Sequence, residues 1–115
     1  MKKFALAPEK ILRLVPAQGY CFATDMITVH GRKVGYMYRE SPENDSDSGW
    51  RFFSGDETQE YVDNPANLEL YDVNTIANYD PEVIPYLQEP VGSAYERDAP
   101  TGIFHKVPLV QATDG

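Results

Sequence analysis

The sequence predicts an α+β fold, a single domain over residues 1–115 with a mainly antiparallel sheet and two or three short helices. Two alternating aromatic runs, 36–39 and 50–53, flank a polar interval and indicate paired strands. Prolines cut the helix-like segments short. The hydrophobic content of 42%, with eight tyrosines and five phenylalanines, is sufficient for one core in a chain of this length.

The chain before the first aromatic run predicts a short helix and a strand. Residues 8–15 have a proline in the first turn and another after the last, which favours a short helix, with an extended arm as the alternative. Residues 18–24 are typical of a mostly buried strand. Residues 25–30 continue it toward a turn at 31–33.

Residues 34–39 and 50–53 predict an antiparallel hairpin, because alternate side chains of a strand face opposite ways. The loop between them is longer than the two to five residues usual in hairpins, and loops of this length are often functional or mobile. Trp50 follows the loop directly. Two interpretations of it stay open, a core anchor or a partly exposed anchor for a binding partner.

Ser54 and Glu57 have the spacing of a capping box, in which the serine accepts from a backbone N–H and the glutamate reaches back. This pattern predicts a short helix that runs through Val62 and ends at 64–65, where proline follows asparagine. Asp56 and Glu57 are then expected in its first turn, where the helix dipole favours negative charge.

The rest of the chain predicts three strands and one short helix. Residues 68–73 alternate as a strand, and 74–78 lack clear periodicity, with two asparagines that indicate a bend. Asp80, followed by proline, predicts a helix of one or two turns, α or 3₁₀ in type. Residues 92–98 and 103–107 predict the last strands, the second at a sheet edge because a proline follows it.

The net charge of −8 is unevenly distributed. Residues 1–39 carry seven Lys/Arg against two acids, and residues 40–98 carry fifteen acids against Arg51 and Arg97. This acidic block repels phosphate backbones, so nucleic acid is not expected as a partner. It attracts a basic protein or a cation, although acids also keep a small protein soluble. Arg97, a rare cation in the block, is expected to form a structural ion pair.

No motif in the sequence indicates catalysis or a metal site. Cys21 is expected to be a small core residue and not a nucleophile. His30 and His105 lack the ligand spacing of a zinc site. The segment from Asp45 begins like a calcium loop, but Trp50 takes the position that requires glycine. Without a phosphate loop or a nucleophile elbow, we expect no enzyme activity, no cofactor and no metal.

The compartment follows from two further features. No apolar run is long enough for a membrane span or an export segment, so no membrane partner is expected. The single cysteine fits a reducing compartment. We therefore expect a cytoplasmic protein.

Five segments of the chain are distinctive: Gly-Tyr-Met-Tyr-Arg-Glu at 35–40, Asp-Ser-Gly-Trp-Arg-Phe-Phe-Ser-Gly-Asp-Glu at 47–57, Tyr-Asp-Val-Asn-Thr-Ile-Ala-Asn at 71–78, Asp-Pro at 80–81 and Gly-Ser-Ala-Tyr-Glu-Arg at 92–97. Together they resemble a bacterial domain family classed as immunity protein thirty-three of polymorphic toxin systems. The similarity covers about residues 19–98, and Ser-Gly-Trp-Arg-Phe-Phe-Ser-Gly-Asp at 48–56 is its most distinctive part. The resemblance implies an α+β protein that is made beside a toxin and neutralises it by direct binding, with no catalytic residues to transfer.

The residues and the resemblance lead to one expected function and one alternative. The expected function is non-catalytic neutralisation of a toxin, with a basic toxin domain as the candidate protein partner, through an acidic, aromatic-bearing surface. The alternative is a small-ligand or regulatory module whose aromatic residues line a pocket between sheet and helices. The residues expected to contact the toxin are Asp45, Asp47, Trp50, Asp56, Glu57 and Glu60.

Overall fold

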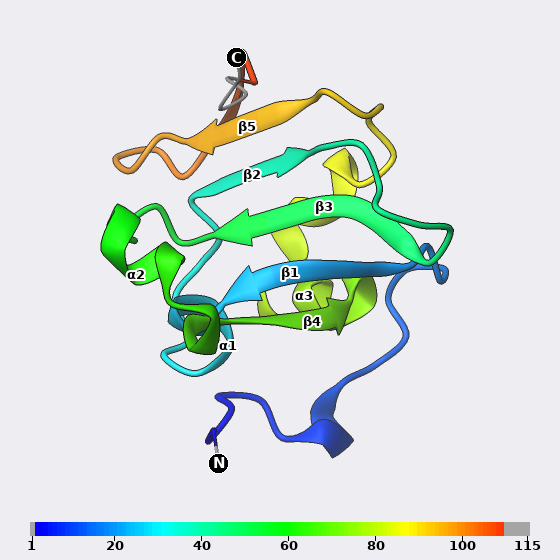
Figure 1. Cartoon of the computed structure of the whole chain (residues 1–115), viewed down its shortest axis with the longest axis vertical. Coiled ribbons are helices and arrows are strands. Elements are labelled where there is room, and N and C mark those ends of the chain that lie inside the picture. The colour runs from blue at the N-terminus through cyan, green and yellow to red at the C-terminus, as the bar shows by residue number, and fades with distance from the viewer. Residues whose placement is uncertain (1, 110–115) are drawn as a thin grey trace.

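A six-stranded sheet forms the centre of the computed structural model, which describes residues 2–109 (Figure 1). The strand order is β4-β1-β3-β2-β5-β6. β1 and β3 pair in parallel, and the other four pairs are antiparallel, which confirms the predicted α+β class with a mainly antiparallel sheet. The strands are β1 (Tyr20–Thr24), β2 (Tyr36–Arg39), β3 (Asp47–Phe53), β4 (Leu68–Asp72), β5 (Ala94–Arg97) and β6 (Phe104–Val107).

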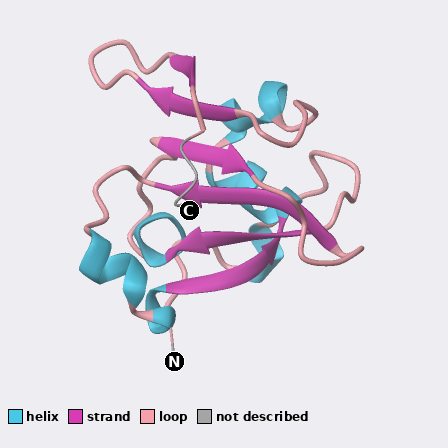
Figure 2. Ribbon diagram, turned by 45° about the horizontal axis from the view of Figure 1, so that its top comes forward, coloured by secondary structure: helices cyan, strands magenta, loops and turns pink. Residues whose placement is uncertain are grey.

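The helices are short, as predicted. In Figures 1 and 2 the strands stand in front, α3 lies behind the sheet, and α2 lies beside the end of β3. No helix within residues 2–109 has the length and apolar character needed to cross a membrane. The α-helices are α1 (Asp25–Thr28), α2 (Gln59–Asp63) and α3 (Val73–Tyr79), and the 3₁₀ helices are η1 (Pro8–Lys10), η2 (Pro65–Asn67) and η3 (Pro81–Tyr86).

The hydrophobic core lies between one face of the sheet and the helices α3 and η3. Trp50 and Phe52 of β3 are completely buried there, and their rings stack with centroids 5.9 Å apart. The indole N–H of Trp50 donates to the backbone carbonyl of Leu87, just after η3, at 3.1 Å. The interpretation of Trp50 as a core anchor is therefore confirmed. Cys21 is also fully buried in this core, as expected, and burial raises the pKa of its thiol.

The predicted hairpin is present, with Met37 opposite Phe52 and Arg39 opposite Trp50. Gly49 at its base has φ +89°, and an added Cβ would overlap the carbonyl oxygen of Glu40. Only glycine is compatible with this conformation and this close approach.

Two segments differ from their sequence-based predictions. Residues 74–78 belong to helix α3 and do not form a bend. Asp72 caps helix α3 locally by accepting from the backbone N–H of Asn74. Asn74 and Asn78 lie one turn apart on this helix, and both hold the backbone of Leu12. Residues 11–15 are not helical, so η1 is the only helical turn in the segment that was predicted to be helical. The extended-arm alternative is the better description.

Residues 25–28 also differ, since they form α1 where the sequence predicted a continuing strand. The C-terminal predictions are confirmed. Asp80 caps η3 by accepting from the backbone N–H of Glu82, and β6 is an edge strand. Arg97 forms its expected ion pair, with Asp80 at 2.9 Å.

Candidate functional site

The face of the sheet opposite the core carries four aromatic side chains on three adjacent strands. Tyr36 and Tyr38 alternate with buried Met37 in β2, and Phe53 follows buried Phe52 in β3. Phe22 of β1 alternates with buried Cys21 in the same way. Since successive side chains of a strand point to opposite faces, these rings lie on the side away from α3. We call Phe22, Tyr36, Tyr38 and Phe53 the aromatic face; each of the four is half-buried.

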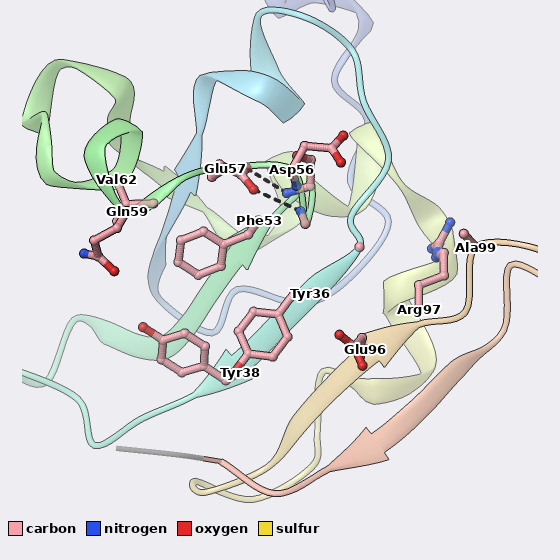
Figure 3. A pocket seen from close by; sticks show the side chains of 13 residues that line it. Tyr36, Tyr38, Phe53, Asp56, Glu57, Gln59, Val62, Glu96, Arg97 and Ala99 are labelled. Carbon is pink, nitrogen blue, oxygen red and sulfur yellow. Dashed lines mark hydrogen bonds between the residues drawn. The ribbon is translucent and has the colours of Figure 1, made fainter. Parts of the chain in front are cut away.

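Three of these rings form one cluster. Tyr38 and Phe53 are stacked, with centroids 5.9 Å apart and an interplanar angle of 13°. Tyr36 lies 5.7 Å from Tyr38 and 6.0 Å from Phe53. Figure 3 shows the three rings side by side on β2 and β3. Their mutual contacts restrict the rotamers of all three rings, so the cluster is preorganised.

The cluster forms the floor of an open cleft of about 620 Å³. The loop from Ser54 to Glu57 and helix α2 form one side of the cleft, and β5 with the residues after it forms the other (Figure 3). A second hollow of about 440 Å³ shares Tyr38, Phe53 and Val62 with the cleft and extends over Phe22. The two hollows together make one concave, aromatic strip. The remaining residues of the cleft are Gly35, Gly55, Asp56, Gln59, Glu96, Arg97 and Ala99.

Acidic side chains surround this strip, and the nearby cations are already paired. Arg32 contacts Asp56 at 2.7 Å, with both side chains exposed. Arg97 is held by Asp80 and Glu82, at 2.9 and 3.2 Å. Because these cations are engaged by acids, the strip keeps a negative bias. The acids around the two hollows are Glu40, Asp56, Glu57, Asp63 and Glu96.

Glu57 is the acid that holds the cleft wall in place. Its carboxylate accepts from the hydroxyl of Thr24 and from the backbone N–H groups of Ser54 and Gly55. Burial opposes its charge, but these hydrogen bonds dominate and lower the pKa of Glu57. Glu57 therefore ties the end of β3 to β1.

The predicted helix start at Ser54 is wrong, although the reach of Glu57 back to the Ser54 N–H is present. Helix α2 begins at Gln59, and Thr58 caps it by accepting from the N–H of Tyr61. Gly55 has φ +97°, a conformation that breaks a helix, so the chain makes a turn first. Asp56 and Glu57 consequently lie in a loop that borders the cleft.

Below the second hollow, Arg51 is buried in an ion-pair network. Both oxygens of Asp47 accept from its guanidinium, and Glu40 accepts from Nε at 2.6 Å. The guanidinium carbon lies 4.8 Å from the Phe22 ring centroid. Desolvation disfavours the charge of Arg51, yet Asp47 and Glu40 raise its pKa. The network supports the floor of the strip; Arg51 and Asp47 are buried in it, whereas the Glu40 side chain keeps 40% of its surface exposed.

The six contact residues predicted from the sequence fall in three separate places. Asp45 and buried Asp47 lie at the beginning of β3, and Asp56, Glu57 and Glu60 lie beyond its end. The two groups are separated by the length of β3, about 20 Å for seven residues. Trp50 lies between them on the core face, fully buried, so its interpretation as an exposed anchor is wrong.

Sequence reasoning missed Tyr36, Tyr38, Phe53 and Glu96 as site residues. The alternation of side chains along these strands is visible in the sequence, but aromatic residues occur on both faces of the hairpin. Alternation alone therefore did not tell which side the helices would cover.

Cys, His, Asp and Glu side chains do not gather in groups of three that would hold a metal ion anywhere in residues 2–109. Cys21 is fully buried in the core and does not line the cleft.

Comparison with known proteins shows that residues 21–108 match a family model described as the immunity protein Imm33 domain. No curated protein and no solved structure matches the chain. The matched region begins in β1 and ends just after β6, so it includes the whole aromatic face and its acidic border. It covers most of the chain and confirms the resemblance noted in the sequence: this protein belongs to the Imm33 immunity protein family.

Proposed function

We propose that this protein neutralises a toxin by binding it directly through the aromatic face. Membership of the Imm33 family supports a toxin-neutralising role. The observation that supports this surface is the strip of half-buried rings over Phe22, Tyr38 and Phe53, with acids along its border. Binding alone explains neutralisation, so the proposal assigns no reaction and no cofactor to the protein.

The aromatic strip has the features of a contact centre. Tyrosine is among the residues that contribute most to binding energy at protein interfaces, and it does so from concave, desolvated positions. An apolar centre with a polar border is the usual arrangement of such interfaces. The strip crosses the adjacent strands β1, β3 and β2, from Phe22 to Tyr36. It is suited to form the apolar centre of an interface of standard size, about 800 Å² on each partner.

The acidic border complements a basic toxin domain. Acids along the border attract a positively charged partner over long range and raise the rate of encounter. Asp45, Asp56 and Glu60 are exposed and remain candidate contacts in this proposal. Asp47 and Glu57 instead support the surface from below, as does Trp50. We place the encounter in the cytoplasm, where a toxin that acts inside the cell would meet its inhibitor.

The test uses the protein encoded in the neighbouring reading frame, which the proposal takes to be the toxin. Tyr38→Ala and Phe53→Ala should each weaken the measured affinity about tenfold or more, because each removes a ring from the centre of the strip. Leu12→Ala is the control, since Leu12 is 63% exposed but lies on the N-terminal arm. If Leu12→Ala weakens binding and the two ring variants bind like the wild type, the proposed surface is wrong.

The second candidate function, a small-ligand module, is supported by the same cleft. The expected place for its pocket, between sheet and helices, is filled by Trp50, Phe52 and Ile76, all fully buried. Only the open cleft with Tyr36 and Tyr38 remains as a ligand site for this candidate. Native mass spectrometry of protein purified from its own cells tests it, and a bound small molecule of constant mass would favour this candidate over the toxin inhibitor.

A further inference from the structure

One row of side chains crosses the aromatic face in register. Phe53 of β3 stands opposite Tyr36 of β2, and Tyr36 stands opposite Glu96 of β5. Directly opposite residues of antiparallel strands share a face, with Cβ atoms roughly 5 Å apart. The carboxylate of Glu96 therefore borders the ring cluster, and Figure 3 shows it beside Tyr36. Both residues line the 620 Å³ cleft.

Glu96 differs from the other acids of the cleft because its carboxylate is not engaged, although His105 of β6 stands directly opposite it in the register. Asp56 is paired with Arg32, and Glu57 is held by three donors. Glu96 is exposed and makes no side-chain hydrogen bond or ion pair with any residue of the described chain, 2–109. Burial raises the pKa of Tyr36, and the charge of Glu96, opposite it in the register, raises this pKa further.

We propose that the cleft between Tyr36, Phe53 and Glu96 is a site for a basic side chain, foremost arginine. This inference rests on the proposed function for the source of that side chain, which the toxin would supply. The faces of aromatic rings attract cations, and the planar guanidinium also stacks on such rings. Glu96 then accepts a charge-assisted hydrogen bond from the same group.

The surroundings of the cleft favour this occupant over others. Arg97, the cation in the lining, is tied to Asp80 and Glu82 and does not neutralise Glu96. An anionic group would be repelled by Asp56, Glu57 and Glu96 together. An apolar side chain would remove Glu96 from water without a partner, which is unfavourable. A guanidinium satisfies both the rings and the carboxylate.

The experiment uses the full chain and two small probes that differ in charge but hardly in shape. N-acetyl-arginine amide is titrated into the isotope-labelled protein, and the ring signals of Tyr36, Tyr38 and Phe53 are followed by NMR. N-acetyl-citrulline amide, in which the guanidinium becomes a neutral urea group, is the matched control. We expect saturable shifts of these ring signals with arginine and several-fold smaller ones with citrulline.

Two variants make the titration specific. Glu96→Gln keeps the size of the side chain but removes its charge, and it should weaken arginine binding about fivefold. Glu9→Gln, on the exposed helix η1, is the control and should leave the affinity for arginine unchanged. The inference is overturned if the two probes give equal shifts, if arginine shifts residues elsewhere, or if Glu96→Gln has no effect.

Toxin binding separates this inference from the proposed function. If Tyr38→Ala abolishes toxin binding but Glu96→Gln alters neither arginine nor toxin binding, the surface is correct and the basic-residue site is wrong. If the arginine probe binds with the expected dependence on Glu96 but Tyr38→Ala leaves the affinity for the toxin unchanged, the proposed surface is wrong and the site for the basic side chain is retained.

Discussion

Both carboxylate oxygens of Asp47 accept hydrogen bonds from the guanidinium of Arg51, four residues further along the same strand. The N···O distances are 2.8 and 3.0 Å. The two residues meet because the register changes between Tyr20, opposite Asp47, and Phe22, opposite Arg51. Two residues of β1 thus face four of β3, which is the signature of a bulge. Asp47 also accepts from the backbone N–H groups of Glu43 and Gly49, so this one carboxylate closes the hairpin loop.

Replacing this carboxylate by an amide should destabilise the protein in a pH-dependent way. The hydrogen bonds from Arg51 are the main reason that the pKa of Asp47 is lowered on folding. A lowered pKa stabilises the folded state above the unfolded value, about 3.9, and this contribution is lost as the pH falls below it. At pH 7, Asp47→Asn leaves Arg51 with only Glu40 as a charged partner, and we expect a loss of about 3 kcal/mol.

Urea unfolding, followed by the fluorescence of Trp50, measures this difference at several pH values. The free energies of wild type and Asp47→Asn should converge between pH 4 and the lowest pH at which both still fold, roughly pH 2. A difference that stays constant from pH 7 to pH 3 would show that the ion pair does not stabilise the fold through the charge of Asp47.

Gly49→Ala should be far more destabilising than a matched glycine substitution elsewhere. Gly49 and Gly92 have similar positive φ angles, +89° and +99°. An added Cβ at Gly49 overlaps the Glu40 carbonyl, whereas at Gly92 it meets nothing within 4 Å. Gly92→Ala therefore carries only the conformational cost, about 1 kcal/mol, and Gly49→Ala adds the overlap, for a total of about 3 kcal/mol. Thermal unfolding of both variants checks this, and equal losses would contradict the close approach.

Trp50→Phe should lower stability without changing toxin affinity. The substitution removes the hydrogen bond to the Leu87 carbonyl and leaves a gap in the core, which together should cost about 2–3 kcal/mol. The Leu87 carbonyl keeps the side-chain amide of Gln18 as a donor, which limits the loss. Circular dichroism measures the unfolding. A folded Trp50→Phe variant that binds the toxin much more weakly would show that the ring contributes to the interface after all.

Charge reversal at the acidic border should slow association with the toxin, on the proposed function. Asp56→Lys combined with Glu60→Lys changes two exposed acids beside the cleft. We expect the association rate constant to fall several-fold at low salt and the effect to shrink at about 0.15 M salt, where charges are screened beyond about 8 Å. Glu9→Lys on the N-terminal arm is the control. Stopped-flow mixing measures the association rate constants of both variants. If the control slows association as much, the net charge of the protein, and not the acidic border of the cleft, determines the rate.

Much of this protein followed from the sequence by itself. The hairpin, β1 and the late strands were predictable because short-range alternation of side chains is a local property of a strand. The cap at Asp80 and the structural pairing of Arg97 also depend on few residues and were predicted correctly. The Imm33 resemblance likewise needed only the order of residues.

Only the tertiary structure decided which side of the hairpin became core and which became surface. Trp50 and Tyr38 are both aromatic and both lie on strands, and the covering helices, remote in sequence, buried the first and left the second half-exposed. In the same way, only the folded chain brings Leu12 to the side chain of Asn74, and only the bulge brings Asp47 to Arg51. Local pattern determines the period of an element, whereas long-range packing determines which of its faces meets water.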